Sequence, residues 1–125
     1  MILLLDAHAL VWWLTADPTL SDAAQSAIRN DRNDVLVSAA TVWELAIKRA
    51  SGKLRLAENL SDAIERAGFK GLRVTLADAE AAAALPMHHR DPFDRMVVAR
   101  ALELDATVVS RDSQLDAYGV DRLPA

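Results

Sequence analysis

Four acidic side chains stand at points in the chain where a solvated surface residue is unexpected: Asp6, Glu44, Asp94 and Asp112. The first ends an apolar run at residues 2–5, and the last follows an apolar run at residues 107–110. The other two lie near the starts of strongly apolar helical patterns. If the fold brings the four carboxylates together, they form an oxygen-lined site suited to Mg²⁺ or Mn²⁺. Such a site predicts phosphodiester hydrolysis.

Two of these acids also have simpler structural interpretations. Asp6 could cap the turn that follows the apolar run through its side-chain oxygen. Glu44 has the spacing of a capping box with Thr41 and of an ion pair with Lys48. Because Glu44 is flanked by apolar residues, a carboxylate there without a cation or a partner would be costly. We therefore expect both acids to belong to the site.

Asp91 and Asp94 are expected to divide two roles at the start of a long helix. Asp91 precedes Pro92, so it is predicted to be the N-cap, with proline at the first helical position. Asp94 shares a helix face with apolar residues, and an inward carboxylate there calls for a cation. Asp112 could simply belong to a polar turn, in which Ser110 bonds the backbone or orients a neighbouring carboxylate.

Short apolar runs alternate with helical patterns along the chain. Strands are expected at residues 2–5, 35–37, 72–76 and 107–110. Helices are expected at about residues 8–14, 21–30, 40–50, 60–67, 75–85 and 91–104, and a mostly irregular tail at 111–125. This alternation predicts an α/β fold whose parallel sheet is covered on both faces. Ligands of such sheets lie beyond the carboxyl ends of the strands, where Asp6 and Asp112 are expected.

The composition predicts one globular domain over residues 1–125, with 52% hydrophobic and 26% charged residues. The lack of cysteine excludes disulfides and zinc–thiolate sites, and it fits a reducing cytoplasm. A net charge of −4 argues against a protein that grips nucleic acid by basic surface alone. It does not argue against an enzyme that engages a phosphodiester through a metal. Neither a signal peptide nor a membrane helix is expected.

The histidines and tryptophans carry weaker signals. His8 could support a neighbouring acid or bond the backbone at a helix start. His88 and His89 lie in a loop without zinc-ligand spacing, so a zinc hydrolase is not expected. Trp43 is expected in the core. Of the adjacent pair Trp12–Trp13, one is free to be partly exposed.

Four stretches of sequence together carry a resemblance to a known family. They are Leu-Leu-Asp-Ala-His-Ala-Leu at 4–10, Ser-Ala-Ala-Thr-Val-Trp-Glu-Leu at 38–45, His-Arg-Asp-Pro-Phe-Asp-Arg-Met at 89–96 and Ser-Arg-Asp at 110–112. Each is weakly specific alone, but their order and spacing are specific. On these motifs the chain resembles the PIN-domain ribonucleases, and within them the VapC-type toxins of type II toxin–antitoxin pairs.

The resemblance covers nearly the whole chain and implies a PIN-like three-layer αβα sandwich with a short, mainly parallel sheet. It implies a Mg²⁺- or Mn²⁺-dependent endoribonuclease, a homodimer and a small antitoxin partner. The family's four acids fall on the four residues named first. We expect Asp6 and Asp94 to be the principal metal ligands. Glu44 and Asp112 would complete the site, directly or through water.

Several carboxylates in one pocket favour a cation, because two charges about 5 Å apart repel by roughly 3 kcal/mol at an effective dielectric constant of 20. Hydrolysis would leave a 5′-phosphate and a 3′-hydroxyl. Basic residues could hold the RNA backbone or be ordinary solvated charges: Lys48, Arg49, Lys53, Arg55, Arg90 and Arg95. An antitoxin would insert a basic side chain into the acidic pocket and lay an apolar segment in a groove, for which Trp12 and Trp13 are candidate walls.

Two other classes of protein stay open. A receiver-type phospho-acceptor domain has a similar size, a parallel sheet and Mg²⁺-binding acids. It needs an acceptor aspartate after its central strand and a late lysine, whereas no acid ends the expected strand 72–76 and no lysine follows Lys70. The second class is a non-catalytic interaction module that keeps the PIN fold, and the intact acids argue against it.

Overall fold

The computed structural model describes residues 1–125 and contains one five-stranded sheet. Its strands are β1 (Ile2–Leu5), β2 (Asp34–Ser38), β3 (Lys70–Leu72), β4 (Thr107–Val109) and β5 (Asp121–Leu123). All neighbouring strands are parallel, in the order β3-β2-β1-β4-β5. The chain therefore builds outwards from a central β1, first on one side and then on the other. The predicted α/β class and parallel sheet are confirmed.

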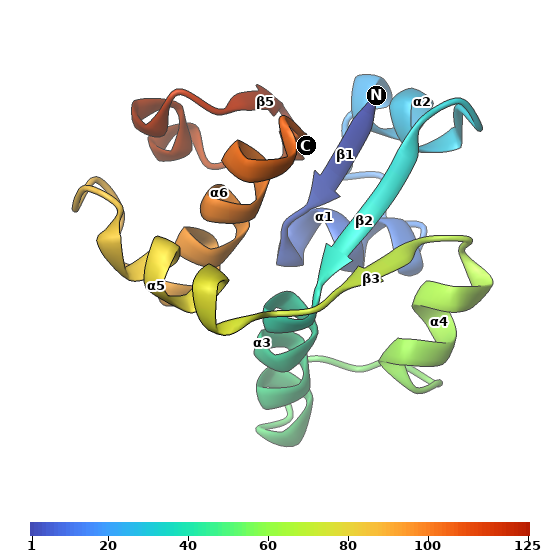
Figure 1. Cartoon of the computed structure of the whole chain (residues 1–125). Coiled ribbons are helices and arrows are strands. Elements are labelled where there is room, and N and C mark those ends of the chain that lie inside the picture. The colour runs from blue at the N-terminus through green and yellow to red at the C-terminus, as the bar shows by residue number, and fades with distance from the viewer.

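Helices cover both faces of the sheet, as predicted for a three-layer sandwich. They are α1 (Ala7–Leu14), α2 (Asp22–Arg29), α3 (Ala39–Ala50), α4 (Leu60–Arg66), α5 (Leu76–Ala84) and α6 (Pro92–Leu104), with a 3₁₀ helix at Ser113–Tyr118. In Figure 1, α5 and α6 lie to one side of the strands, and α1, α2 and α4 lie to the other. None of these helices is both long and apolar enough to cross a bilayer.

The alternation of side chains along β1 explains the two cores. Leu3 and Leu5 point into a cluster with residues of α1, α2 and α4, whereas Leu4 points into a second cluster with residues of α6. Successive strand residues face opposite sides of a sheet, so a strand covered on both faces must be apolar at every position. The unbroken leucine run follows from this requirement.

Two predictions about the sheet were wrong. The third strand lies at 70–72 and not at 72–76, because Thr75 is the N-cap of α5 and forms a capping box with Asp78. The tail was expected to be mostly irregular, yet residues 121–123 pair with β4 as an edge strand. That strand reads Asp-Arg-Leu and is only partly buried, so it lacks the apolar run by which the other strands were predicted.

Candidate active site

The central pair of strands, β1 and β4, creates the site. The direction in which strands are added reverses between them, and ligands of α/β sheets bind at such a reversal, beyond the carboxyl ends of the strands. Asp6 directly follows β1, and Asp112 lies three residues after β4. A cavity of about 480 Å³ opens here, and its lining includes all four predicted acids together with Asp91. The remaining lining residues are Ala7, His8, Trp12, Lys48 and Arg111.

Asp6 serves as a helix cap and also faces the cavity. It is the N-cap of α1, and its Oδ1 accepts the Ala9 N–H at 2.9 Å. The residue is only 6% exposed. Burial raises the pKa of its carboxyl, while hydrogen bonds from Ser110 and Ala9 oppose this rise. The capping interpretation of Asp6 is therefore correct but incomplete. Asp6 caps α1 and also lines the acidic cavity, which capping alone does not require.

Glu44 reaches the cavity from the second turn of α3. Its carboxylate pairs with Lys48 at 3.3 Å, as the i,i+4 spacing predicted. The apolar residues that flank Glu44 in the sequence were taken to bury it, and this was wrong for two of them, since Trp43 is 64% exposed and Ile47 is 47% exposed. Helix α3 buries only Thr41 and Leu45, whereas the other apolar neighbours of Glu44 (Trp43, Ala46 and Ile47) face outwards.

Trp43 was placed in the core by its apolar sequence neighbours, and this prediction was also wrong. Its ring instead makes an edge-on contact with the ring of Phe93 at 5.2 Å between centroids. Trp12 and Trp13 are both partly buried. Trp13 packs against Phe69, and Trp12 lies beside His8 at the cavity.

Asp91 caps the start of α6, as predicted. Oδ1 of Asp91 accepts the N–H groups of Phe93 and Asp94, at 2.8 and 3.1 Å, which makes Asp91 the N-cap. The carboxyl of Asp94 has its pKa raised to about 7, mainly by burial and next by the charge of Asp91, with smaller contributions from Asp6 and Glu44. Five acids therefore line one cavity, and one of them, Asp94, holds its proton near neutral pH.

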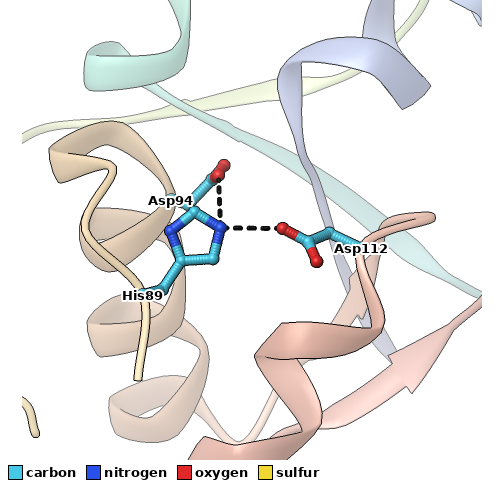
Figure 2. A group of neighbouring side chains, drawn as sticks. All are labelled: His89, Asp94 and Asp112. Carbon is cyan, nitrogen blue, oxygen red and sulfur yellow. Dashed lines mark hydrogen bonds and ion pairs between the residues drawn. The ribbon is translucent and has the colours of Figure 1, made fainter. Parts of the chain in front are cut away.

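His89, which was not predicted to be a site residue, lies between two of the acids (Figure 2). Its Nε2 is 2.7 Å from Oδ2 of Asp112 and 3.3 Å from Oδ2 of Asp94. The three side chains come from the loop before α6, from α6 itself and from the start of the 3₁₀ helix. Asp6 and Glu44 line the same cavity but lie outside this tight group. Two sequence signals pointed to His89: it begins the motif at residues 89–96, and it lies two residues before the capping Asp91.

The basic residues proposed to hold RNA separate into distinct sets. Arg95 is 6% exposed and donates to backbone carbonyls, so it cannot hold a substrate. Arg49 likewise donates to the carbonyls of Leu56 and Glu58. Lys48 lines the acidic cavity, and so does Arg111, which the sequence analysis did not select.

The donor set fits a divalent cation. Carboxylate oxygens are the ligands that Mg²⁺ and Mn²⁺ prefer, and four acids from separate elements converge on one cavity. Only Lys48 and Arg111 supply permanent positive charge to its lining, and Lys48 is already paired with Glu44. Burial is the main cause of the raised pKa of Asp94, and the neighbouring acids raise it further, so a cation there would offset an unfavourable negative charge.

Comparison with known proteins shows the family of this chain. A model of the PIN domain family matches residues 3–121. The chain is 30% identical over 123 residues to Ribonuclease VapC22 of Mycobacterium tuberculosis (strain ATCC 25618 / H37Rv), covering 92% of this chain and 90% of that protein. The chain therefore belongs to the PIN domain family.

Solved structures agree on the fold. VapBC2 from Rickettsia felis, bound to a DNA fragment from its promoter, matches with a TM-score of 0.70 at 14% identity, covering 98% of both chains. VapC20 of Mycobacterium tuberculosis, a toxin that cleaves the sarcin–ricin loop, matches with a TM-score of 0.64 at 14% identity. That match covers 94% of this chain and 95% of VapC20.

Proposed function

We propose that this protein is a Mg²⁺- or Mn²⁺-dependent endoribonuclease that acts as the toxin of a toxin–antitoxin pair. The observation that carries the proposal is the convergence of Asp6, Glu44, Asp94 and Asp112 on one cavity at the carboxyl ends of β1 and β4. The 30% identity to a VapC ribonuclease over nearly the whole chain supports the same activity. The cavity is open enough to admit a phosphodiester and is lined mainly by polar residues.

Each acid has a proposed part in this reaction. Asp6 and Asp94 would be the principal ligands of the cation, and Glu44 and Asp112 would complete the site. When bound, the cation supplies a Lewis acid that activates water and offsets charge developing on the phosphate. Lys48 and Arg111 lie at the lining of the same cavity and would contact the phosphates that flank the bond to be cut.

The proposed antitoxin contact has a structural basis in Trp12. This side chain lines the acidic cavity and also a neighbouring cavity of about 490 Å³, which includes Trp13, Pro18 and Leu20. The two cavities therefore adjoin at Trp12, whose ring lies under the guanidinium of Arg111. We propose that an antitoxin lays an apolar stretch in the neighbouring cavity and inserts an arginine among the acids, where a planar guanidinium can pair with carboxylates.

A homodimer is part of the proposal. Trp43 and Ile47 are four residues apart on α3, so they share a face of the helix, and both are largely exposed. Large exposed apolar side chains on one face are typical of protein interfaces, in which tryptophan is enriched. This face is the surface that we propose for dimerisation.

A mixed RNA pool tests the ribonuclease proposal. The purified protein would be incubated with the pool in Mg²⁺, in Mn²⁺ or in EDTA, and the cut ends mapped. Cleavage in either metal, none in EDTA and 5′-phosphate products are expected. If the folded protein binds Mn²⁺ but does not cleave RNA, the ribonuclease proposal fails. The protein would then be better described as a non-catalytic interaction module.

The receiver-type alternative can be set aside on specific residues. Residues 70–72 form an edge strand, so the reasoning that placed the acceptor position after residues 72–76 was wrong. Asp6, which follows the central β1, occupies the corresponding position. The late lysine of a receiver is still missing, because no lysine follows Lys70.

A further inference from the structure

His89 is held at every polar atom that it possesses. Its backbone N–H donates to Tyr118 Oη at 2.9 Å, and its carbonyl accepts from Arg95 at 3.1 Å. Its ring Nδ1 accepts the backbone N–H of Asp91 at 3.1 Å. Its Nε2 faces the two acids, Asp94 and Asp112 (Figure 2). The orientation of this ring is therefore set by the fold, independently of any ligand.

The contact with Asp91 determines which ring nitrogen carries hydrogen. A backbone N–H can only donate, so Nδ1 of His89 must offer its lone pair. In a neutral imidazole the hydrogen is then on Nε2, which donates to Asp112 and also points towards Asp94. A ring nitrogen that carries hydrogen has no lone pair for a cation. His89 thus lies close enough to the acids to belong to a metal centre, yet it has the wrong tautomer for a ligand.

Arg95 and Tyr118 hold the loop that carries His89. The buried guanidinium of Arg95 donates to a series of acceptors in and after the last turn of α5: the carbonyls of Ala82, Ala83, Leu85, Pro86 and His89, and Tyr118 Oη. Tyr118 in turn donates to the carbonyl of Pro86 at 2.7 Å. The orphan carbonyls at a helix C-terminus attract positive charge, which explains why an arginine is buried here without a carboxylate partner.

We propose that His89 is a positioning residue whose Nε2–H bridges Asp94 and Asp112 and orients both carboxylates for a cation, without binding the cation itself. This inference rests on the proposed metal site. Without the bridge, Asp112 would keep only the N–H of Gln114 as its hydrogen-bond donor, at 2.9 Å on Oδ1. Groups that orient metal ligands in this way typically contribute 10- to 100-fold to metal affinity.

The tautomer can be tested in the metal-free protein. Nitrogen-15 NMR of the imidazole rings at neutral pH reports which nitrogen carries hydrogen, and no variant is needed. We expect hydrogen on Nε2 of His89. The exposed neighbour His88 provides an internal reference, since its ring only makes an edge-on contact with Tyr118. Hydrogen on Nδ1 of His89 would overturn the proposal.

Metal binding tests the role of the bridge. His89→Ala should weaken Mn²⁺ binding in calorimetry by about 10- to 100-fold. His89→Gln, whose amide can place an N–H near the position of Nε2, should recover part of that loss. His88→Gln is the matched control and should bind Mn²⁺ as the wild type does. Equal affinity in wild type and His89→Ala would overturn the proposal.

Pulsed electron paramagnetic resonance of the Mn²⁺-loaded protein separates a bridge from a ligand. A directly bound imidazole nitrogen couples strongly to the Mn²⁺ electron spin, and we expect no such coupling from His89. A strong nitrogen coupling that disappears in His89→Ala would show that His89 is a ligand and overturn the proposal. If the wild type binds no Mn²⁺, the proposed metal-dependent function is wrong. The bridge would then have no cation to serve, whichever tautomer NMR finds.

Discussion

The Oδ1 atom of Asp91 lies 3.1 Å from the backbone nitrogen of Asp94, so one acid holds the turn that carries the other. The charge of Asp91 also raises the pKa of Asp94, second only to burial. The two residues are therefore coupled in two ways, although only Asp94 is expected to bind the cation. Substitution by asparagine keeps the shape of each side chain and removes its charge, so it can separate these contributions.

Cleavage of RNA should distinguish the two residues. Asp94→Asn should fold and lose most activity, because it removes a charge that we assign to metal binding. Asp91→Asn should keep most activity, because asparagine is also a good N-cap. Initial rates in saturating Mg²⁺, with melting curves as the check on folding, measure both effects. Equal loss of activity in the two variants would show that the division of roles is wrong.

The stability of the metal-free protein should depend on pH through Asp94. Its pKa is raised from 3.8 to about 7, so the folded form keeps a proton that the unfolded chain releases above about pH 4. The stability contributed by this group is therefore present at low pH and is lost as the pH rises from about 4 to about 7. Asparagine at position 94 cannot ionise, so the Asp94→Asn variant avoids this loss of stability.

In EDTA at about pH 8, Asp94→Asn should accordingly be more stable than the wild type. The side chain is 25% exposed, so we expect a gain on the order of 1–2 kcal/mol, less than the full shift implies. The difference should shrink towards zero near pH 4. Urea unfolding at several pH values measures it, and a variant less stable than the wild type at about pH 8 would contradict the assigned pKa.

Added Mg²⁺ or Mn²⁺ should raise the melting temperature, because binding to the folded form alone contributes about 2.7 kcal/mol at a hundredfold excess over the dissociation constant. Asp6→Asn should lose most of this increment while keeping the cap of α1. Glu80→Gln, on the exposed side of α5, is a suitable control that should respond to metal like the wild type. Equal metal-induced shifts in wild type and Asp6→Asn would place the cation elsewhere.

Neighbouring residues of α3 should respond differently to truncation. Leu45 is 2% exposed, and Leu45→Ala should cost about 2–5 kcal/mol of unfolding free energy. Trp43→Ser should cost about 1 kcal/mol in the monomer, since it removes mainly an edge-on contact with Phe93. Light scattering across a dilution series should show that Trp43→Ser weakens the proposed dimer. Unchanged self-association would move the interface away from α3.

Local sequence signals were enough to predict a residue's role where that role depends on residues nearby in the sequence. The N-cap at Asp91 and the capping box of Thr75 and Asp78 are contacts within three residues, and both were predicted correctly. Strand β1, which has helices on both faces, was predicted from its unbroken apolar run. Asp6, Glu44, Asp94 and Asp112 were brought to one cavity as expected, although their individual parts in metal binding are still predictions.

Features that depend on distant residues were not predictable in the same way. His89 acquires its role from Asp112, which is 23 residues away, and from the tautomer imposed by Asp91. Strand β5 exists because β4 offers it an edge, not because its own sequence is apolar. Trp43 is exposed because α3 buries Thr41 and Leu45 on another face, and flanking apolar residues do not reveal which face a helix buries.

The strand order also has a consequence during synthesis. Leu3 of the central strand pairs with Thr107 of β4, so the two strands that frame the site can meet only after the ribosome has made nearly all of residues 1–125. Contacts between residues so far apart in sequence form late and slowly. Nascent chains that stop short of β4 also lack Asp112. A growing chain would therefore be inactive at least until residues 107–112 have been made and β4 has joined the sheet.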